Sequence, residues 1–407
     1  MMDRSLFALL CVSAWINYMD RGNLSVAAPV LGPELGLTTT QMGILFSSFF
    51  WTYSLLQPLA GWLVDRWDVY RIYAAGFALW SIAVAAGGFA TGFWTLLAAR
   101  LALGIGESIA YPAYSKIMAQ GFPEQRRGFA NSMIDVGTKA GPALGTLVGG
   151  LMIAVWGWRP FFILMGGVSL IWLVPWLKAI PKDQAKAKKG ERGTSMLAIL
   201  RLRPAWATFL GLFCSNYAYY FLLTWLPSYL VVERKFSLKA MAVVGALPYC
   251  ATALASLTGG YCADRWIRAG ADAGRVRQTI AVSGLLLCAA TLPFAAFART
   301  SVAMVCLIVA FAGIGLFTSC VWAITQTLAG KSAAGMWTGL QNGVGNMGGV
   351  VAPVVTAWVY QSTGSFTGSF LIASLMLVFA AGFFGLLVGR IRQVIQTTVD
   401  VGECCDA

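Results

Sequence analysis

The sequence contains no histidine and few charged residues, and these two scarcities limit what the protein can be. Charged residues make up 11% of its 407 positions, against about 25% in a typical soluble domain. Because hydrophobic residues make up 58% of the chain, most of its surface must meet lipid rather than water. Without histidine, the side chain that normally titrates near neutral pH, any proton chemistry must use carboxylates.

Enzymatic features are also missing. The nine cysteines include no pair at the spacing of metal ligands, and there is no catalytic triad or phosphate-binding loop. We therefore expect no metal, no cofactor and no enzymatic reaction. A net charge of +13 would suit a nucleic-acid partner, but the positive residues gather in alternate loops, as membrane orientation requires. The expected partner is a lipid bilayer, and not a nucleic acid.

Long apolar stretches predict an all-α membrane protein with twelve transmembrane helices, since a bilayer span needs about 20 residues. We expect two pseudo-symmetric six-helix bundles, residues 1–180 and 205–392, joined by a basic cytoplasmic linker, 181–204, and followed by a cytoplasmic tail, 393–407. The expected spans are 5–31, 41–64, 72–90, 93–119, 128–155, 158–180, 205–232, 241–263, 278–298, 301–329, 335–361 and 366–389.

The distribution of lysine and arginine predicts the orientation. These residues gather in the loops after the even-numbered spans and near both termini, so both termini are expected in the cytoplasm. The loop with Arg234, Lys235 and Lys239 is the exception. We expect a monomeric, multi-pass protein of the plasma (inner) membrane.

A repeated motif relates the two halves. Residues 61–66 (Gly-Trp-Leu-Val-Asp-Arg) match residues 260–265 (Gly-Tyr-Cys-Ala-Asp-Arg) at an offset of 199 (260 − 61), and the same offset places Asn17 on Asn216. Both copies point the same way, as in a parallel repeat. The glycine permits close helix approach, and the charged pair predicts a gate at the cytoplasmic edge, with simple interfacial anchoring as the alternative. The predicted gate residues are Asp65, Arg66, Asp264 and Arg265.

Six ionisable residues lie deep in predicted spans, and all belong to the first half. Each costs ~2.5–3.5 kcal/mol at mid-bilayer unless it pairs or faces a wet cavity. If Asp20 and Glu107 take up protons, Arg21 and Arg100 become free for an anionic ligand, and the planar guanidinium of arginine suits a carboxylate. Asp135 and Lys139 are four residues apart, which is the spacing of a structural ion pair, although Lys139 is an alternative anion contact. The six are Asp20, Arg21, Arg100, Glu107, Asp135 and Lys139.

The segment 61–71 (GWLVDRWDVYR) resembles the signature loop of the major facilitator superfamily, and departs from it at Asp68, where the family usually has glycine. The segments 17–23 (NYMDRGN) and 216–229 resemble the anion:cation symporter branch, which includes bacterial sugar-acid/proton symporters such as galactonate and hexuronate importers. The resemblance covers essentially the whole chain. It implies a carboxylate substrate, coupling protons carried by Asp20 and Glu107, and a substrate contact at Arg21.

The second half has no charged residue away from the ends of its spans. The repeat places Tyr219 and Tyr220 where the first half has Asp20 and Arg21. Hydroxyl, amide and aromatic groups of this kind suit a polyhydroxylated ligand. The predicted substrate-binding residues, which the resemblance supports in part, are Arg21, Arg100, Tyr18, Tyr53, Tyr219, Ser319, Trp322 and Asn342.

These features predict a secondary active transporter that imports a small organic anion, most simply a sugar acid such as a hexonate or hexuronate, with protons by alternating access. Two transport alternatives stay open. Residues 137–145 resemble a motif of proton-coupled antiporters, which would export an organic compound. The aromatic side chains would also suit import of another carboxylate, such as an aromatic acid. A receptor of the same fold is the alternative without transport.

Overall fold

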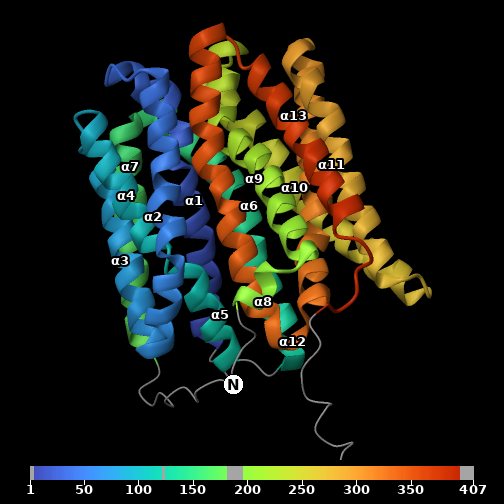
Figure 1. The fold of residues 1–407 in the computed structure, drawn as a ribbon. Helices are drawn as coiled ribbons and strands as arrows, with labels where there is room; N and C mark the ends of the chain where they lie inside the picture. The colour runs from blue at the N-terminus through green and yellow to red at the C-terminus, as the bar shows by residue number, and fades with distance from the viewer. Residues whose placement is uncertain (1–3, 122–123, 181–195, 395–407) are drawn as a thin grey trace, which may run out of the picture.

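The computed structural model describes residues 4–121, 124–180 and 196–394; the side chains of residues 58, 65, 119–132, 135, 331–332 and 334–335 lie outside this description. All the elements within these ranges are helical (Figure 1). They are α1 (Arg4–Glu34), α2 (Thr39–Arg66), α3 (Val69–Gly87), α4 (Phe93–Glu107), α5 (Ala110–Gly121), α6 (Glu124–Trp156), α7 (Trp158–Ala179), α8 (Met196–Leu200), α9 (Arg203–Ser228), the π-helical turn η1 (Tyr229–Glu233), α10 (Leu238–Arg268), α11 (Ala273–Phe297), α12 (Thr300–Thr363), α13 (Thr367–Gly382) and the π-helical turn η2 (Phe383–Leu387).

Among the described residues, eight helices are long and apolar enough to cross a membrane. The prediction of an all-helical membrane protein is therefore confirmed, whereas the total of twelve spans and the positions of the termini stay predictions. Two expected spans differ in detail. The span 93–119 is divided between α4 and α5, and the spans 301–329 and 335–361 run together as α12.

The two predicted spans that run together as α12 meet at a bend, and the bend lies at one glycine. Gly330 has φ +67° and ψ 179°, a non-helical conformation that side chains with a Cβ rarely adopt. The side chain of Gln393 fills the space beside it, so that a Cβ at this position would lie 2.4 Å from the Gln393 amide nitrogen. The next residue along the chain, Val394, donates its backbone N–H to the carbonyl of Leu328 at 2.9 Å. The segment after η2 is thus attached to the bend of α12.

The second helix of each half starts at the repeat offset. The helix α2 begins at Thr39 and α10 at Leu238, which is the offset of 199 (238 − 39) found in the sequence repeat. Contacts between the halves pair α1 with α9, α2 with α12, and α6 with α10. Figure 1 shows these long helices running side by side. The domain boundaries at 180 and 205 stay a prediction.

Hydrogen bonds between the halves lie toward one end of the bundle, where α1 ends and α2 begins. Ser25 donates to the carbonyls of Leu223 and Thr224 at 2.8 and 2.7 Å, and Ser47 donates to the carbonyl of Val350 at 2.7 Å. Thr40 contacts Gln361 nearer the same end. The contacts of Ser25, Ser47 and Thr40 hold the two halves together at this end. This end is therefore the closed one.

The last turn of α1 is fixed to the rest of the first half by Glu34. The carboxylate of Glu34 accepts a hydrogen bond from the indole of Trp158 at 2.6 Å and lies 3.4 Å from the Arg159 guanidinium. Arg159 in turn donates to the carbonyl of Ala90 at 2.9 Å, just beyond α3. One carboxylate and one arginine thus connect α1 with the start of α7 and the end of α3.

The second half repeats this arrangement with different residues. Glu233, at the same offset of 199 (233 − 34), accepts the backbone N–H of Phe366 at 2.9 Å, just before α13. Arg234 donates to the carbonyls of Ala295 and Ala298 at 2.7 and 2.9 Å, at the end of α11. Arg234 therefore caps the terminal carbonyls of a helix. This contact accounts for a basic residue in the loop that departs from the general charge pattern.

Candidate anion and proton site

The centre of the candidate site is a buried ion pair between α1 and α4. Arg21 donates from Nη2 and Nε to the same oxygen of Glu107, Oε2, at 2.8 and 3.2 Å. Arg21 is 6% exposed and Glu107 is fully buried. The sequence placed both residues deep in the first half, and the structure brings them into direct contact. A pair of this kind is stable in a low-dielectric interior only while both partners stay charged.

Aromatic rings surround the guanidinium of Arg21. Its central carbon lies 4.7 Å from the ring centroids of Tyr18 and Tyr53, and 4.9 Å from that of Phe49. Such contacts stabilise a cation that has lost most of its water. The hydroxyl of Tyr18 is 2.8 Å from that of Tyr111, which follows α4 at the start of α5. Arg21 thus lies among three rings, two of which belong to predicted substrate-binding residues.

Asp20, the neighbour of Arg21, faces a different way, into the interior of the first half. It is fully buried and accepts a hydrogen bond from the Asn23 amide at 3.1 Å through Oδ1. Its other oxygen, Oδ2, has no hydrogen-bond partner among the described residues. The side chains of Trp80 on α3 and Ser169 on α7 face this carboxylate. The two predicted proton carriers therefore have different hydrogen-bond partners, Arg21 for Glu107 and Asn23 for Asp20.

Arg100 lies on α4, two turns before Glu107, and is 7% exposed. Its Nε donates to the carbonyl of Leu45 at 3.3 Å, and its guanidinium carbon lies 5.3 Å from the ring of Phe49. Arg100 and Asp20 line the same small cavity of about 20 Å³. No ion pair within 4.0 Å links Arg100 to an acid in the part of the chain that the structure describes.

Tyr220 of the second half lies near the Arg21 cluster, because its neighbour Phe50 is 4.9 Å from Phe49 between ring centroids. Tyr220 on α9 packs on Phe50 of α2, with ring centroids 4.4 Å apart, and its hydroxyl donates to Oδ1 of Asn346 at 2.6 Å. Tyr219, the predicted substrate contact beside it, is half-buried, with its ring centroid 5.5 Å from that of Tyr220.

The other predicted residues of the second half have different neighbours. Ser319 donates to the carbonyl of Leu316 at 2.7 Å and packs against Gly259 of α10. The carbonyl of Asn342 accepts the Asn346 amide at 2.9 Å, and Trp322 is half-buried. Within the described residues, no contact joins these three side chains to Arg21. Their role in substrate binding stays a prediction.

The predicted gate is only partly visible. The side chains of Asp65 and Asp135 lie outside the described residues, so neither the first copy of the gate nor the pairing of Asp135 with Lys139 is tested. Arg66 lies over the ring of Trp62 at 5.3 Å, and Asp264 and Arg265 are exposed at the end of α10. The gating role of these residues stays a prediction.

Sequence reasoning missed several members of the site. Phe49 and Tyr111 were not singled out because an isolated aromatic residue in an apolar span is usually packing. A signal was nevertheless present. Phe49 is four residues before Tyr53 and Tyr111 is four residues after Glu107, so each shares a helix face with a predicted site residue. Asn17 is a further omission, since it is buried and its amide has no hydrogen-bond partner among the described residues.

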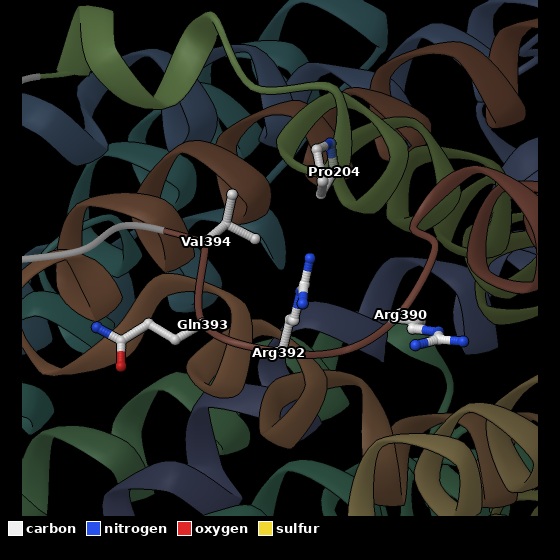
Figure 2. A pocket seen from close by; sticks show the side chains of 5 residues that line it. All are labelled: Pro204, Arg390, Arg392, Gln393 and Val394. Carbon is white, nitrogen blue, oxygen red and sulfur yellow. The ribbon is translucent and has the colours of Figure 1, made fainter.

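A larger pocket lies elsewhere, at the start of α9. It has a volume of about 680 Å³ and is lined by Pro204, Arg390, Arg392, Gln393 and Val394. Figure 2 shows Arg392 and Val394 pointing into its opening, with Pro204 on the far side and Gln393 turned away. Pro204 precedes Tyr220 by 16 residues on α9, or about 24 Å along the helix axis. This pocket is therefore separate from the ion-pair site.

Long apolar helices that bury an arginine–glutamate pair beside the contact between two halves define a multi-pass membrane transporter. Comparison with known proteins identifies its family. The model of the Major Facilitator Superfamily matches residues 10–353, more than half of the chain. The chain belongs to this superfamily. It is a secondary transporter and not an enzyme.

Similar curated proteins are transporters of organic anions. The chain is 30% identical to the hexuronate transporter of Bacillus subtilis (strain 168) over 386 residues, which cover 91% of each chain. It is 31% identical to the probable sulfoacetate transporter SauU of Cupriavidus necator, over 91% of this chain and 90% of that one. It is 29% identical to the D-galactonate transporter of Escherichia coli O6:H1, over 95% of both. These matches confirm the resemblance to sugar-acid transporters.

The fold is also similar to a solved structure. The bacterial homologue of the human lysosomal transporter Spinster, in an inward-facing and unoccupied conformation, matches with a TM-score of 0.79 over 94% of this chain and 96% of that chain. At 17% sequence identity, this similarity establishes the fold alone.

Proposed function

We propose that the protein imports a small organic anion, a sugar acid of the hexonate or hexuronate type, together with protons across the plasma membrane. The observation that carries this proposal is the buried pair of Arg21 and Glu107 within its aromatic surroundings. An arginine that already binds a carboxylate of the protein can exchange it for a carboxylate of a substrate, because the two groups offer the same hydrogen-bond acceptors.

The exchange links the anion to a proton. While Glu107 is ionised, it holds the Nε and Nη2 donors of Arg21. A proton on Glu107 removes its charge, and the guanidinium is then left without a counter-ion in a buried site, which is costly. A substrate carboxylate restores the pairing with two parallel hydrogen bonds. Proton and anion therefore favour each other's binding, as symport requires.

Neutral polar groups of the second half suit the body of a sugar acid. Tyr217 and Gln341 are buried, and the Tyr217 hydroxyl and the Gln341 amide nitrogen have no hydrogen-bond partner among the described residues. Asn346 and Tyr220 hydrogen-bond to each other near the Arg21 cluster. A ligand with several hydroxyls offers these groups both donors and acceptors. The relatives named for hexuronate and D-galactonate support this substrate class.

Alternating access requires the two halves to separate at either end in turn. The hydrogen bonds of Ser25 and Ser47 close the end where α1 ends. With both termini in the cytoplasm, as the positive residues predict, this closed end faces outward. The structure then corresponds to a state from which the substrate is released inward.

Uptake into proteoliposomes tests the proposal. Purified protein should accumulate a labelled hexuronate or hexonate when the outside is acidic, and Glu107→Gln should abolish accumulation while retaining part of the exchange between labelled and unlabelled substrate. Uptake indifferent to the proton gradient contradicts proton coupling. Reversing the gradient separates import from the antiport alternative, and sulfoacetate and an aromatic acid should be included as competing substrates.

A further inference from the structure

A small cavity lies inside the first half, between α1, α3, α4 and α7. Its volume is about 20 Å³, and its polar lining consists of Asp20 and Arg100. The rest of the lining is apolar and includes Ala83, Leu103 and Phe162. Arg21 and Glu107 do not line this cavity, so it is distinct from the ion-pair site.

Both polar groups at the cavity have hydrogen-bonding capacity left. Oδ2 of Asp20 is buried without a hydrogen-bond partner, while Oδ1 accepts the Asn23 amide. Arg100 makes one hydrogen bond within the described residues, from Nε to Leu45, although a guanidinium carries five N–H donors. Asp20 and Arg100 thus both contribute to the lining of one space, and within the described residues no direct hydrogen bond joins their side chains.

The size of the cavity selects its occupant. A cavity needs about 10–15 Å³ to hold one water molecule, and the water needs at least two polar partners. The volume of about 20 Å³ admits one water and is too small for a substrate. We propose that one water molecule binds here and bridges Oδ2 of Asp20 to the guanidinium of Arg100. Arg100 is then a positioning residue for Asp20, and not a contact for the substrate.

This arrangement accounts for the two arginines that lie deep in the first half, Arg21 and Arg100. Arg21 balances Glu107 by direct contact, and Arg100 balances Asp20 through the water. The other groups facing Asp20 are Asn23 on its own helix, Trp80 on α3 and Ser169 on α7, all of them neutral, and Glu107 acts on it from α4 as a second acid. Among the residues that line the cavity, Arg100 is the basic one. The assignment of Asp20 as a coupling acid rests on the proposed function.

Two variants of nearly equal shape test the bridge. Ala83 is buried and lines the cavity. Ala83→Val fills the space with a methyl group, whereas Ala83→Thr fills it with a hydroxyl that can replace the water. We expect Val to lower gradient-driven hexuronate accumulation about tenfold, because it leaves a buried acceptor unsatisfied, and Thr to retain most of it. Equal losses in both variants, at equal thermal stability, would overturn the proposal.

Variants of Arg100 distinguish a positioning role from direct contact with the substrate. Arg100→Met should lower the maximal rate of proton-driven uptake and leave the KM for hexuronate nearly unchanged, with Arg100→Lys in between. A KM raised tenfold at an unchanged maximal rate would instead show that Arg100 binds the substrate.

A structural measurement decides the question even if hexuronate is not transported. A structure at a resolution that shows ordered water should contain one water within hydrogen-bond distance of Asp20 and Arg100 in the wild type, and none in Ala83→Val. A dry cavity in the wild type overturns the proposal, whereas a wild type that shows the water but no proton-driven uptake overturns the proposed function alone.

Discussion

Arg21 on α1 binds a single oxygen of Glu107 on α4 with two of its N–H groups, at 2.8 and 3.2 Å. The second oxygen of the carboxylate, Oε1, has no hydrogen-bond partner among the described residues. The pair is therefore strong enough to hold Arg21 in place but does not use the full capacity of either group. A substrate carboxylate that accepts two parallel hydrogen bonds competes with Glu107 on favourable terms.

Arg21→Lys tests the need for a planar guanidinium. Lysine keeps the charge but loses the fork of donors and the stacking on Tyr18, Tyr53 and Phe49. We expect initial rates of hexuronate uptake at least about tenfold lower, since each lost charged hydrogen bond costs about 1.5–3 kcal/mol. Arg4→Lys, at the exposed start of α1, is the control and should transport normally. Normal uptake by Arg21→Lys would remove Arg21 from the substrate site.

Tyr220→Phe tests the contribution of the second half. The change removes the hydroxyl that donates to Asn346 at 2.6 Å and keeps the ring against Phe50. We expect a several-fold higher KM for a sugar acid, because the polar group that orients its hydroxyls is altered, and little change for sulfoacetate, which has none. A parallel change for both ligands would place Tyr220 outside the substrate contacts.

Arg234→Met should destabilise the second half. The arginine donates to three carbonyls at the end of α11, those of Ala295, Ala296 and Ala298. The Ala295 carbonyl keeps the hydroxyl of Tyr229, but those of Ala296 and Ala298 lose the Arg234 donor, at a cost of about 2 kcal/mol or more, which thermal unfolding in detergent should detect. Arg299→Met removes an exposed arginine near the same end and is the control, with little change expected. Equal unfolding temperatures for the two variants would contradict a capping role.

Gly330→Ala should also destabilise the fold. At φ +67°, with Gln393 against its α-carbon, this position strains any residue with a Cβ. The expected cost is about 1 kcal/mol or more. Gly339→Ala is the matched control: it lies on the same element with nothing within 4 Å of an added Cβ, and alanine favours a helix there. If the unfolding temperatures of Gly330→Ala and Gly339→Ala fell equally, the proposed role of Gly330 in the bend of α12 would be contradicted.

The fold was largely accessible from the sequence because its strongest signals are local. Runs of apolar residues and the repeat at 199 residues both depend on composition along the chain. The contacts of the site were less accessible. Asp20 and Arg21 are adjacent in sequence, yet they face different surroundings, because neighbouring helix positions point about 100° apart. Which helix lies on each side is a property of tertiary packing, so the pairing of Arg21 with Glu107 required the structure.

The contacts that Glu34 and Glu233 make with neighbouring helices could not be predicted from the sequence, for a related reason. The two glutamates are related by the repeat offset. The arginines beside them come from different elements, Arg159 from α7 and Arg234 from the residue after η1. Sequence alignment of the halves cannot match residues that occupy the same place from different helices. In the sequence Arg234 departs from the charge pattern of the loops, whereas in the structure it caps the end of α11.

The central claim is that a substrate carboxylate displaces Glu107 from Arg21 once Glu107 is protonated. The most direct test is the affinity of purified protein for hexuronate, measured by calorimetry over a range of pH. The account predicts that binding to the wild type tightens as the pH falls, because protons remove the internal competitor. Glu107→Gln, which has no charge to compete with, should bind tightly with little dependence on pH. If hexuronate binding to Glu107→Gln retained the full pH dependence of the wild type, the exchange of partners at Arg21 would be contradicted.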